Sequence, residues 1–331
     1  YNITQVNDLT LHAVKQYHHS LMKYKKENGL YDFTDMLESY ESTLPIDICI
    51  IDEAQDLSSL QYKMAIRASL SASEVYIAGD DDQGIFGWAG ADITKFLSLK
   101  GKKRILPKSY RIPSSVHSLA GDVVKRIKNR YPKEWQPRDE KGSVEYVVSE
   151  QDIDFSAEGT WMLLSRSKYL LNRYKQAVRQ QGFAYNIYGK SSLDSEETRA
   201  IISWEKMRKG ESISNHEAKN IINFLGFKVK IEKLEKYFIN DIGLPSDERE
   251  YLRSCLRNGE KFSSKPRITI STIHQSKGGE ADNLVLLTDM GKLSWENLGG
   301  DEENRVWYVA LTRTKQNLFL VRPRGLRYFE V

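Results

Sequence analysis

The stretch Ile48-Cys49-Ile50-Ile51-Asp52-Glu53-Ala54-Gln55-Asp56-Leu57 decides the fold class of this chain. Its apolar half predicts a short buried strand of the kind found in parallel sheets. The two carboxylates that follow lie at the carboxyl end of a strand, where open α/β sheets bind ligands. Asp52 could hold a magnesium ion, and Glu53 could orient or deprotonate a water, as in nucleotide hydrolases. The alternative interpretation is a solvated turn or a helix N-cap.

A second apolar run, Val75 to Ala78, leads into a loop with glycines at positions 79, 84, 87 and 90. Such a loop exposes its backbone and turns tightly. Gln83 can donate and accept hydrogen bonds together, which suits a residue that senses a phosphate and a water. Phe86 and Trp88 lie outside any apolar periodicity, so they could stack on unpaired bases. The alternatives are that Trp88 packs in a core and that Asp80 to Asp82 form a polar turn or a metal cluster.

The segments Asp52 to Asp56 and Gly79 to Gln83 together resemble motifs II and III of the UvrD/Rep/PcrA family, which are superfamily 1A DNA helicases. The remaining motifs follow in the order of the family. Ser109-Tyr110-Arg111 resembles motif IV. Thr272 to Glu280 resembles motif V, and Val306 to Lys315 resembles motif VI. The resemblance implies an α/β fold with two RecA-like parallel-sheet domains, the first incomplete, and a small helical insertion in the second.

The resemblance also implies roles at the site of ATP hydrolysis. Asp52 would bind Mg²⁺, Glu53 would activate the attacking water, and Gln83 would contact the γ-phosphate and couple the site to DNA. Arg111 and Arg313 would supply positive charge to the transferring phosphoryl group, because the planar guanidinium suits phosphate oxygens. Both arginines could instead be ordinary surface salt-bridge partners.

Further residues are implied for nucleotide and DNA binding. Tyr110 would stack on adenine, Glu280 would hydrogen-bond the ribose, and Gly278 would belong to the same site. Phe86 and Trp88 would stack on single-stranded bases, with Thr272 and His274 near the DNA backbone. Tyr110 could equally be a core residue, and His274 could be a buried histidine whose hydrogen bonds are satisfied.

Composition predicts a globular chain of about two domains. The 331 residues are 28% charged and 40% hydrophobic, with a net charge of +4 that permits nucleic-acid binding without demanding it. No apolar stretch approaches the length of a membrane span, and no signal peptide is recognisable. Cys49 and Cys255 lack the spacing of a zinc site, so we expect a reduced, cytoplasmic protein that does not bind membranes.

The order of strands and helices predicts a doubly wound sheet. We expect the C-terminal part of a first motor domain at 1–103 and a second motor domain at 104–191 and 266–331. Residues 192–265 are poor in strand signals, which predicts a helical accessory insertion and a possible surface for a protein partner. The strands of the second domain are predicted at 143–148, 161–165, 268–273, 283–288 and 317–322.

One expected motif is missing from the sequence. The phosphate-binding loop G-x-x-x-x-G-K-S/T has only one near match, Ala184 to Ser191, whose apolar middle instead predicts a strand end and a turn. We therefore expect a fragment of a longer helicase that lacks the front of its first motor domain. On its own, this chain is expected to hydrolyse ATP weakly or not at all.

Three functions follow from these patterns. The leading one is an ATP- and Mg²⁺-dependent translocase or helicase, moving 3′ to 5′ by resemblance, on single-stranded DNA and on junctions with a single-stranded tail. The second is an ATPase-inactive module that binds DNA or a partner protein. The third is a metal-dependent nuclease built on Asp80, Asp81, Asp82 and the motif II carboxylates.

Overall fold

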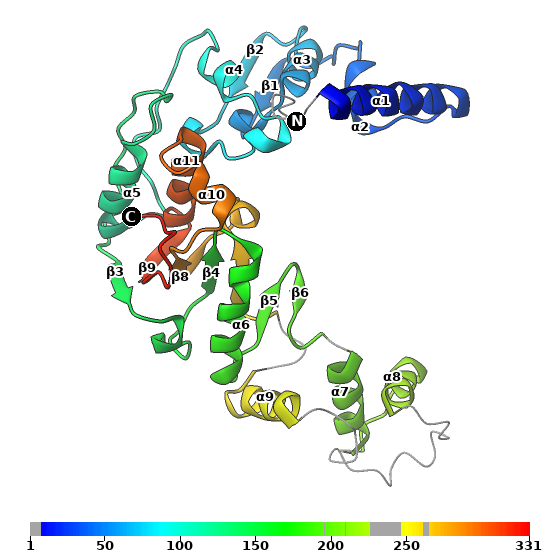
Figure 1. The fold of residues 1–331 in the computed structure, drawn as a ribbon, viewed down its shortest axis with the longest axis vertical. Coiled ribbons are helices and arrows are strands. Elements are labelled where there is room, and N and C mark those ends of the chain that lie inside the picture. The colour runs from blue at the N-terminus through cyan, green and yellow to red at the C-terminus, as the bar shows by residue number, and fades with distance from the viewer. Residues whose placement is uncertain (1–7, 195, 209, 226–245, 261–264) are drawn as a thin grey trace. The chain divides into compact units, whose positions relative to one another are not determined.

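The computed structural model describes residues 8–194, 196–208, 210–225, 246–260 and 265–331 (Figure 1). The chain is divided into two compact units, and each unit is made of stretches that are not continuous in the sequence. The first unit takes the residues up to Pro107 together with Val123–Trp135 and Gly299–Val309. The second unit takes Lys108–Asp122, Gln136–Leu298 and Ala310–Val331.

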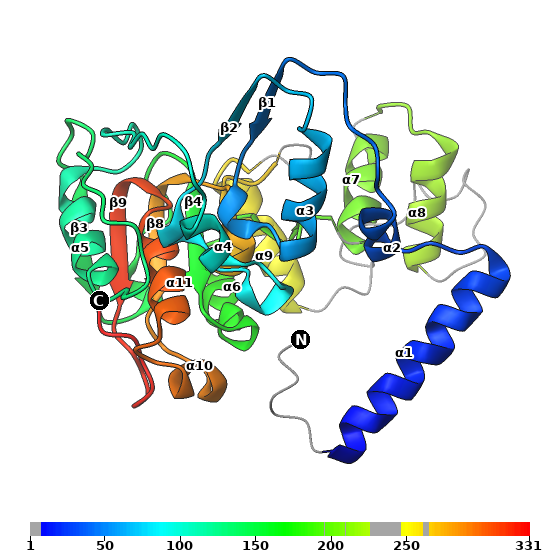
Figure 2. The ribbon, with the colours of Figure 1, turned by 90° about the horizontal axis from the view of Figure 1, so that it is seen from above.

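The first unit contains a two-stranded parallel sheet. Strands β1 (Ile48–Ile51) and β2 (Glu74–Ile77) pair in register from Ile48 with Glu74 to Ile51 with Ile77, and Figure 2 shows them side by side. The parallel strand predicted from the apolar half of the opening segment is therefore present, but the prediction that it is buried is wrong, because its residues are exposed or half-buried and Ile50 is 72% exposed. Both strands are followed by the polar residues that the sequence marks as functional.

Helices α1 (Asp8–Asn28), α2 (Phe33–Glu38), α3 (Ser59–Ala68) and α4 (Ile93–Leu97) also belong to the first unit. Helix α3 follows motif II, and it begins with a capping box. The Ser58 hydroxyl accepts from the Gln61 backbone amide, and the Gln61 side chain accepts from the Ser58 amide. This cap fixes where the chain turns after the motif II segment.

A seven-stranded sheet in the order β3-β9-β8-β4-β7-β5-β6 forms the second unit. All neighbouring strands are parallel except β5 and β6, which pair antiparallel. All five predicted strands are present, with ends displaced by a few residues at most. The strands are β3 (Ser143–Val147), β4 (Trp161–Ser165), β5 (Tyr185–Ile187), β6 (Lys190–Ser191), β7 (Ile268–Thr272), β8 (Ala281–Leu287) and β9 (Thr314–Val321).

Strand β4 is buried along its whole length, as expected for a central strand covered on both faces. Its core neighbours include Tyr174 of α6 (Leu171–Gln180), whose hydroxyl donates to the backbone oxygen of Leu164 at 2.7 Å. The near match to a phosphate-binding loop is strand β5, a turn and strand β6. The sequence interpretation of that segment is confirmed.

The described part of 192–265 is helical, as predicted. It contains α7 (Glu196–Arg208), α8 (Asn215–Leu225) and α9 (Ser246–Arg257), while 226–245 and 261–264 lie outside the described residues. Helices α7 and α8 pack against each other (Figure 2). The remaining helices are α5 (Ser114–Val124), α10 (Lys292–Glu296) and α11 (Asp301–Leu311). None of the helices in the described ranges is both long enough and apolar enough to cross a membrane.

Candidate nucleotide and nucleic-acid sites

The motif II carboxylates follow directly on strand β1, and both side chains are exposed. An Asp52 carboxylate oxygen accepts from the Glu53 amide at 2.8 Å. Glu53 adopts a left-handed conformation, with φ 50° and ψ 36°, which is uncommon for a residue other than glycine. Such a conformation persists only where the surroundings impose it, and it is often found at functional sites.

Gln55 is the residue that imposes order on this turn. Its side chain is fully buried, its Nε2 donates to Glu53 Oε2 at 2.5 Å, and its Oε1 accepts from the Asp80 amide at 3.0 Å. The approach requires Gly79, because a Cβ there would lie 2.5 Å from Gln55 Oε1. No pattern in the sequence marks Gln55 as a site residue, although Gln55 lies within the motif II segment.

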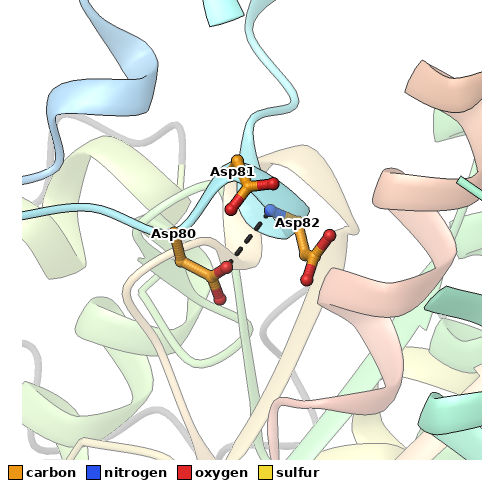
Figure 3. Close-up of side chains that lie close together, drawn as sticks. All are labelled: Asp80, Asp81 and Asp82. Carbon is orange, nitrogen blue, oxygen red and sulfur yellow. Dashed lines mark hydrogen bonds between the residues drawn. The ribbon is translucent and has the colours of Figure 1, made fainter. Parts of the chain in front are cut away.

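The motif III segment continues this hydrogen-bonded chain. Asp80 Oδ2 accepts from Gln83 Nε2 at 2.6 Å, and Asp80 Oδ1 accepts from the Asp82 amide at 3.1 Å, the contact dashed in Figure 3. Glu53 and Gln83 are thereby connected through Gln55 and Asp80. The structure thus brings together the two residues to which the family resemblance assigns hydrolysis and coupling.

The two loop aromatics lie immediately beyond. Phe86 and Trp88 make an edge-to-face contact, with ring centroids 6.3 Å apart. Trp88 is 67% exposed, so it does not pack in the core of this unit. Phe86 is half-buried, so Trp88 is the ring of the pair that is exposed for stacking on unpaired bases.

Asp80, Asp81 and Asp82 have carboxylate oxygens within 4.8 Å of one another, a spacing that a metal ion could bridge (Figure 3). Positively charged side chains of the protein already lie beside these three carboxylates. Lys133 forms ion pairs with all three aspartates, and Arg130 pairs with Asp82. Burial alone would lower the pKa of Lys133, but the charges of Asp80 and Asp82 outweigh it and raise that pKa. The arrangement favours an internal ion-pair network over a metal centre.

In the second unit, residues from motifs IV, V and VI converge on Glu280. Lys315 Nζ lies 2.6 Å from Glu280 Oε1, and Arg111 Nη1 lies 3.8 Å from Glu280 Oε2. The hydrogen bond from Lys315 lowers the pKa of Glu280, and the charges of Arg111 and Arg313 act in the same direction. Lys315 lies within motif VI, but no pattern in the sequence singles it out.

Arg313 is 2% exposed and is held by its neighbours. Its Nη1 donates to the backbone oxygen of Gly279 at 3.4 Å, and its Nη2 donates to Thr312 Oγ1 at 3.3 Å. Gly278 has φ 80°, which favours glycine at that turn. The alternative of a surface salt bridge does not hold for Arg313, because its guanidinium is buried.

Two features of motif IV suit an anionic ligand with an aromatic base. Tyr110 is 85% exposed, so its ring is not part of the core. The Nε of Arg111 is buried and meets no acceptor within the described part of the chain. A buried N–H without a partner is costly, and a phosphate oxygen would satisfy it.

Thr272 and His274 lie at the carboxyl end of β7. Thr272 is 6% exposed, and its Oγ1 lies 3.1 Å from Gln275 Oε1. Burial lowers the pKa of His274 to about 4, with the nearby charge of Arg166 acting in the same direction. His274 is therefore uncharged at neutral pH, so any contact with a DNA backbone would be a hydrogen bond from a neutral ring.

Comparison with known proteins agrees with the motifs. Residues 2–104 match the family described as UvrD/REP helicase N-terminal domain. The ATP-dependent DNA helicase PcrA of Bacillus subtilis is 27% identical over 180 residues, which cover 47% of this chain and 24% of PcrA. The F-box DNA helicase protein 1 of Schizosaccharomyces pombe is 25% identical over 336 residues, covering 90% of this chain and 35% of that protein.

A shorter match has higher identity. DNA helicase II of Haemophilus influenzae is 34% identical over 97 residues, covering 28% of this chain and 13% of that protein. The chain spans about a third or less of the length of these three relatives. The match of residues 2–104 to the UvrD/REP helicase N-terminal domain family, these helicase relatives and the ordered motifs together support a similarity of the chain to UvrD-type superfamily 1A helicases.

Proposed function

We propose that this chain is part of an ATP-driven translocase that moves 3′ to 5′ along single-stranded DNA and unwinds duplexes that carry a single-stranded tail. Its relatives named as ATP-dependent DNA helicases support this proposal. The observation that carries it is the hydrogen-bonded chain from Glu53 through Gln55 and Asp80 to Gln83. It connects a carboxylate suited to activating water with a loop that carries the exposed ring of Trp88 and the half-buried ring of Phe86.

The first-unit residues fit the chemistry of a magnesium–nucleotide complex. Asp52 offers an exposed carboxylate at the end of a parallel strand, and oxygen ligands are those that Mg²⁺ prefers. The ion would be held by Asp52 and would supply positive charge to phosphate oxygens. Glu53 would orient the attacking water and accept its proton, and Gln83 would contact the γ-phosphate.

In the second unit we assign Tyr110 to stacking on adenine and Glu280 to the ribose hydroxyls. Gly278 leaves room beside them. Arg111 and Arg313 would supply positive charge to the transferring phosphoryl group. The buried Nε of Arg111 supports this role, because a phosphate oxygen would give it the acceptor that the described residues do not.

For the nucleic acid, we assign Phe86 and Trp88 to base stacking and Thr272 and His274 to backbone contacts. We further propose a first motor domain at 1–103, a second at 104–191 and 266–331, and an accessory insertion at 192–265. The paired helices α7 and α8 of that insertion would offer a surface to a protein partner or a DNA junction.

The test is a titration of the chain with a fluorescent single-stranded oligonucleotide, with and without ATP and Mg²⁺, at two salt concentrations. Salt-sensitive binding that ATP shifts is expected if the nucleotide and DNA sites are coupled. Absence of binding under all conditions would contradict the proposal. ATP turnover, measured in parallel, is expected to be weak, because residues 1–331 contain no G-x-x-x-x-G-K-S/T sequence.

The second candidate is a module that binds DNA or a partner protein without turning over ATP. Oligonucleotide binding that ignores ATP and Mg²⁺ would support this candidate over the motor. The nuclease alternative is disfavoured by the pairing of Asp81 and Asp82 with protein cations. Metal-dependent cutting of DNA that Asp80→Ala abolishes would restore it.

A further inference from the structure

Three stretches of chain that are distant in sequence meet at Asp81 and Asp82 within the first unit. Asp81 is 3% exposed and Asp82 is fully buried. Both belong to the short helical turn Asp81–Gln83, directly ahead of the aromatic loop. Figure 3 shows the two side chains extending from this turn, and their carboxylates pair with Arg130 and Lys133 of the stretch Val123–Trp135.

The stretch Val123–Trp135 supplies the first set of partners. Arg130 donates two parallel hydrogen bonds to Asp82, from Nε to Oδ1 at 2.8 Å and from Nη2 to Oδ2 at 2.7 Å. Lys133 Nζ lies 2.8 Å from Asp82 Oδ2 and also pairs with Asp81. The Tyr131 amide donates to Asp81 Oδ2 at 2.7 Å. A bidentate arginine–carboxylate pair fixes orientation as well as distance.

Helix α11 supplies the second set. Arg305, which is 4% exposed, donates from Nε to the backbone oxygen of Asp81 at 2.8 Å and from Nη2 to the backbone oxygen of Asn129. Asp301 accepts from the amides of Lys128 and Asn129 at 2.9 and 2.7 Å. Arg305 therefore contacts both other stretches at once, and it lies on the helix that leads into motif VI.

The aromatic loop makes a further close approach to the same helix. A Cβ at Gly87 would lie 3.2 Å from Glu302 Oε1, so the loop backbone lies beside the end of the Glu302 side chain of α11. Gly87 lies between Phe86 and Trp88 in the sequence. The loop is thus held at one end by the aspartates and lies beside an α11 side chain between its two aromatic residues.

We propose that Asp81 and Asp82 are positioning residues that fix the Phe86–Trp88 loop against Arg130, Lys133 and Arg305, so that single-strand binding by the loop depends on this buried anchor. The inference rests on the proposed function for the use of the loop, but the anchor itself does not. The carboxylates of Asp81 and Asp82 pair with other side chains of the protein. Because Trp88 follows Asp82 closely in the sequence, fixing the two aspartates restricts where the Phe86 and Trp88 rings can lie.

The decisive variant is Asp82→Asn. It removes a negative charge, so electrostatics alone would tighten the binding of an anionic oligonucleotide. The anchor predicts the opposite sign: about tenfold weaker binding, equivalent to losing roughly one base stack. The dependence of affinity on salt should stay unchanged, because no phosphate contact is removed. Asp139→Asn, at an exposed aspartate paired with Lys108, is the matched control and should leave the affinity unchanged or slightly tighter.

A purely structural role is separated by repeating the measurement in a Trp88→Ala background. If Asp82 acts through the aromatic loop, Asp82→Asn should weaken binding far less there, whereas general loss of structure would weaken binding equally in both backgrounds. Arg130→Lys keeps the charge and loses the parallel bonds. Arg130→Lys should therefore weaken oligonucleotide binding less than Asp82→Asn does. It replaces Asp82→Asn as the test variant if the latter does not fold.

The effect of the Asp82 contacts on the position of Trp88 can also be measured without DNA. In 5-fluorotryptophan-labelled chain, the ¹⁹F resonance of Trp88, assigned by its loss in Trp88→Phe, should shift in Asp82→Asn and not in Asp139→Asn. An unshifted resonance would overturn the inference, as would unchanged or tighter binding by Asp82→Asn where the unmodified chain binds. If the unmodified chain does not bind but the resonance shifts, the proposed function fails and the anchor stands.

Discussion

The Gln55 side-chain amide donates to the Glu53 carboxylate at 2.5 Å from a fully buried position. Because the same side chain accepts from the Asp80 amide, position 55 must donate and accept together. A carboxylate could not donate and an aliphatic side chain could do neither. The chemistry of one residue therefore ties the turn after β1 to the turn after β2.

Replacing Gln55 with leucine should destabilise the first unit. The substitution leaves the part-buried Asp80 amide without its acceptor, and an unsatisfied group costs up to roughly 1–3 kcal/mol of unfolding free energy where it is buried. Urea unfolding measures the change. Gln151→Leu, at an exposed glutamine of the second unit, is the control and should change stability by no more than about 0.5 kcal/mol. Equal effects in the two variants would argue against a structural role for the Gln55 contacts.

Glu53→Gln should abolish ATP hydrolysis in the intact helicase while nucleotide binding persists. The amide cannot take the proton of the attacking water, and loss of a general base typically costs about 10²–10⁴-fold in rate. Turnover and nucleotide affinity are measured side by side, with Glu145→Gln on the exposed part of β3 as the control. Turnover that survives in Glu53→Gln would remove Glu53 from the proposed mechanism.

Trp88→Ala should weaken binding of single-stranded DNA. Loss of one base–aromatic stack is worth roughly 1–3 kcal/mol. Fluorescence anisotropy with a labelled oligonucleotide provides the measurement. Trp295→Ala, at the partly exposed tryptophan of α10, is a matched control that should leave affinity unchanged. If both variants bind like the unmodified chain, the loop aromatics do not contact the bases.

His274 should make the stability of the second unit fall with acid. Its folded pKa of about 4 lies below the ordinary value of 6.5, so between these values the unfolded state binds more protons. The free energy of unfolding should therefore fall as pH drops below 6.5, by about 2 kcal/mol at pH 5.

Urea unfolding at pH 7 and pH 5 tests this dependence. His274→Gln should lose most of the difference between the two pH values. His18→Gln, at an exposed histidine of α1, should retain it. A His274→Gln variant as sensitive to acid as the unmodified chain would show that other groups dominate.

Sequence patterns predicted most of the sheet and the residues of the motifs, because both are written locally. The apolar runs of β4, β7 and β8 mark buried strands, and the motif spacings mark Glu53 and Gln83. The ion-pair partners were not predictable in this way. Arg130 lies 48 residues from Asp82, and Arg305 lies 224 residues from Asp81, so only the tertiary fold selects them.

The strand order of the second unit has a consequence for how the chain acquires this structure. Strand β3 pairs with β9, and the first matched residues, Ser143 and Asn317, are 174 residues apart. A parallel sheet with such distant pairing must close a long loop before its contacts form, which slows folding. Until β9 inserts between β3 and β8, both strands present open edges that invite pairing with other chains. We therefore expect the folding intermediate without β9 to aggregate readily, so that the yield of folded protein should rise with chaperones or at low temperature.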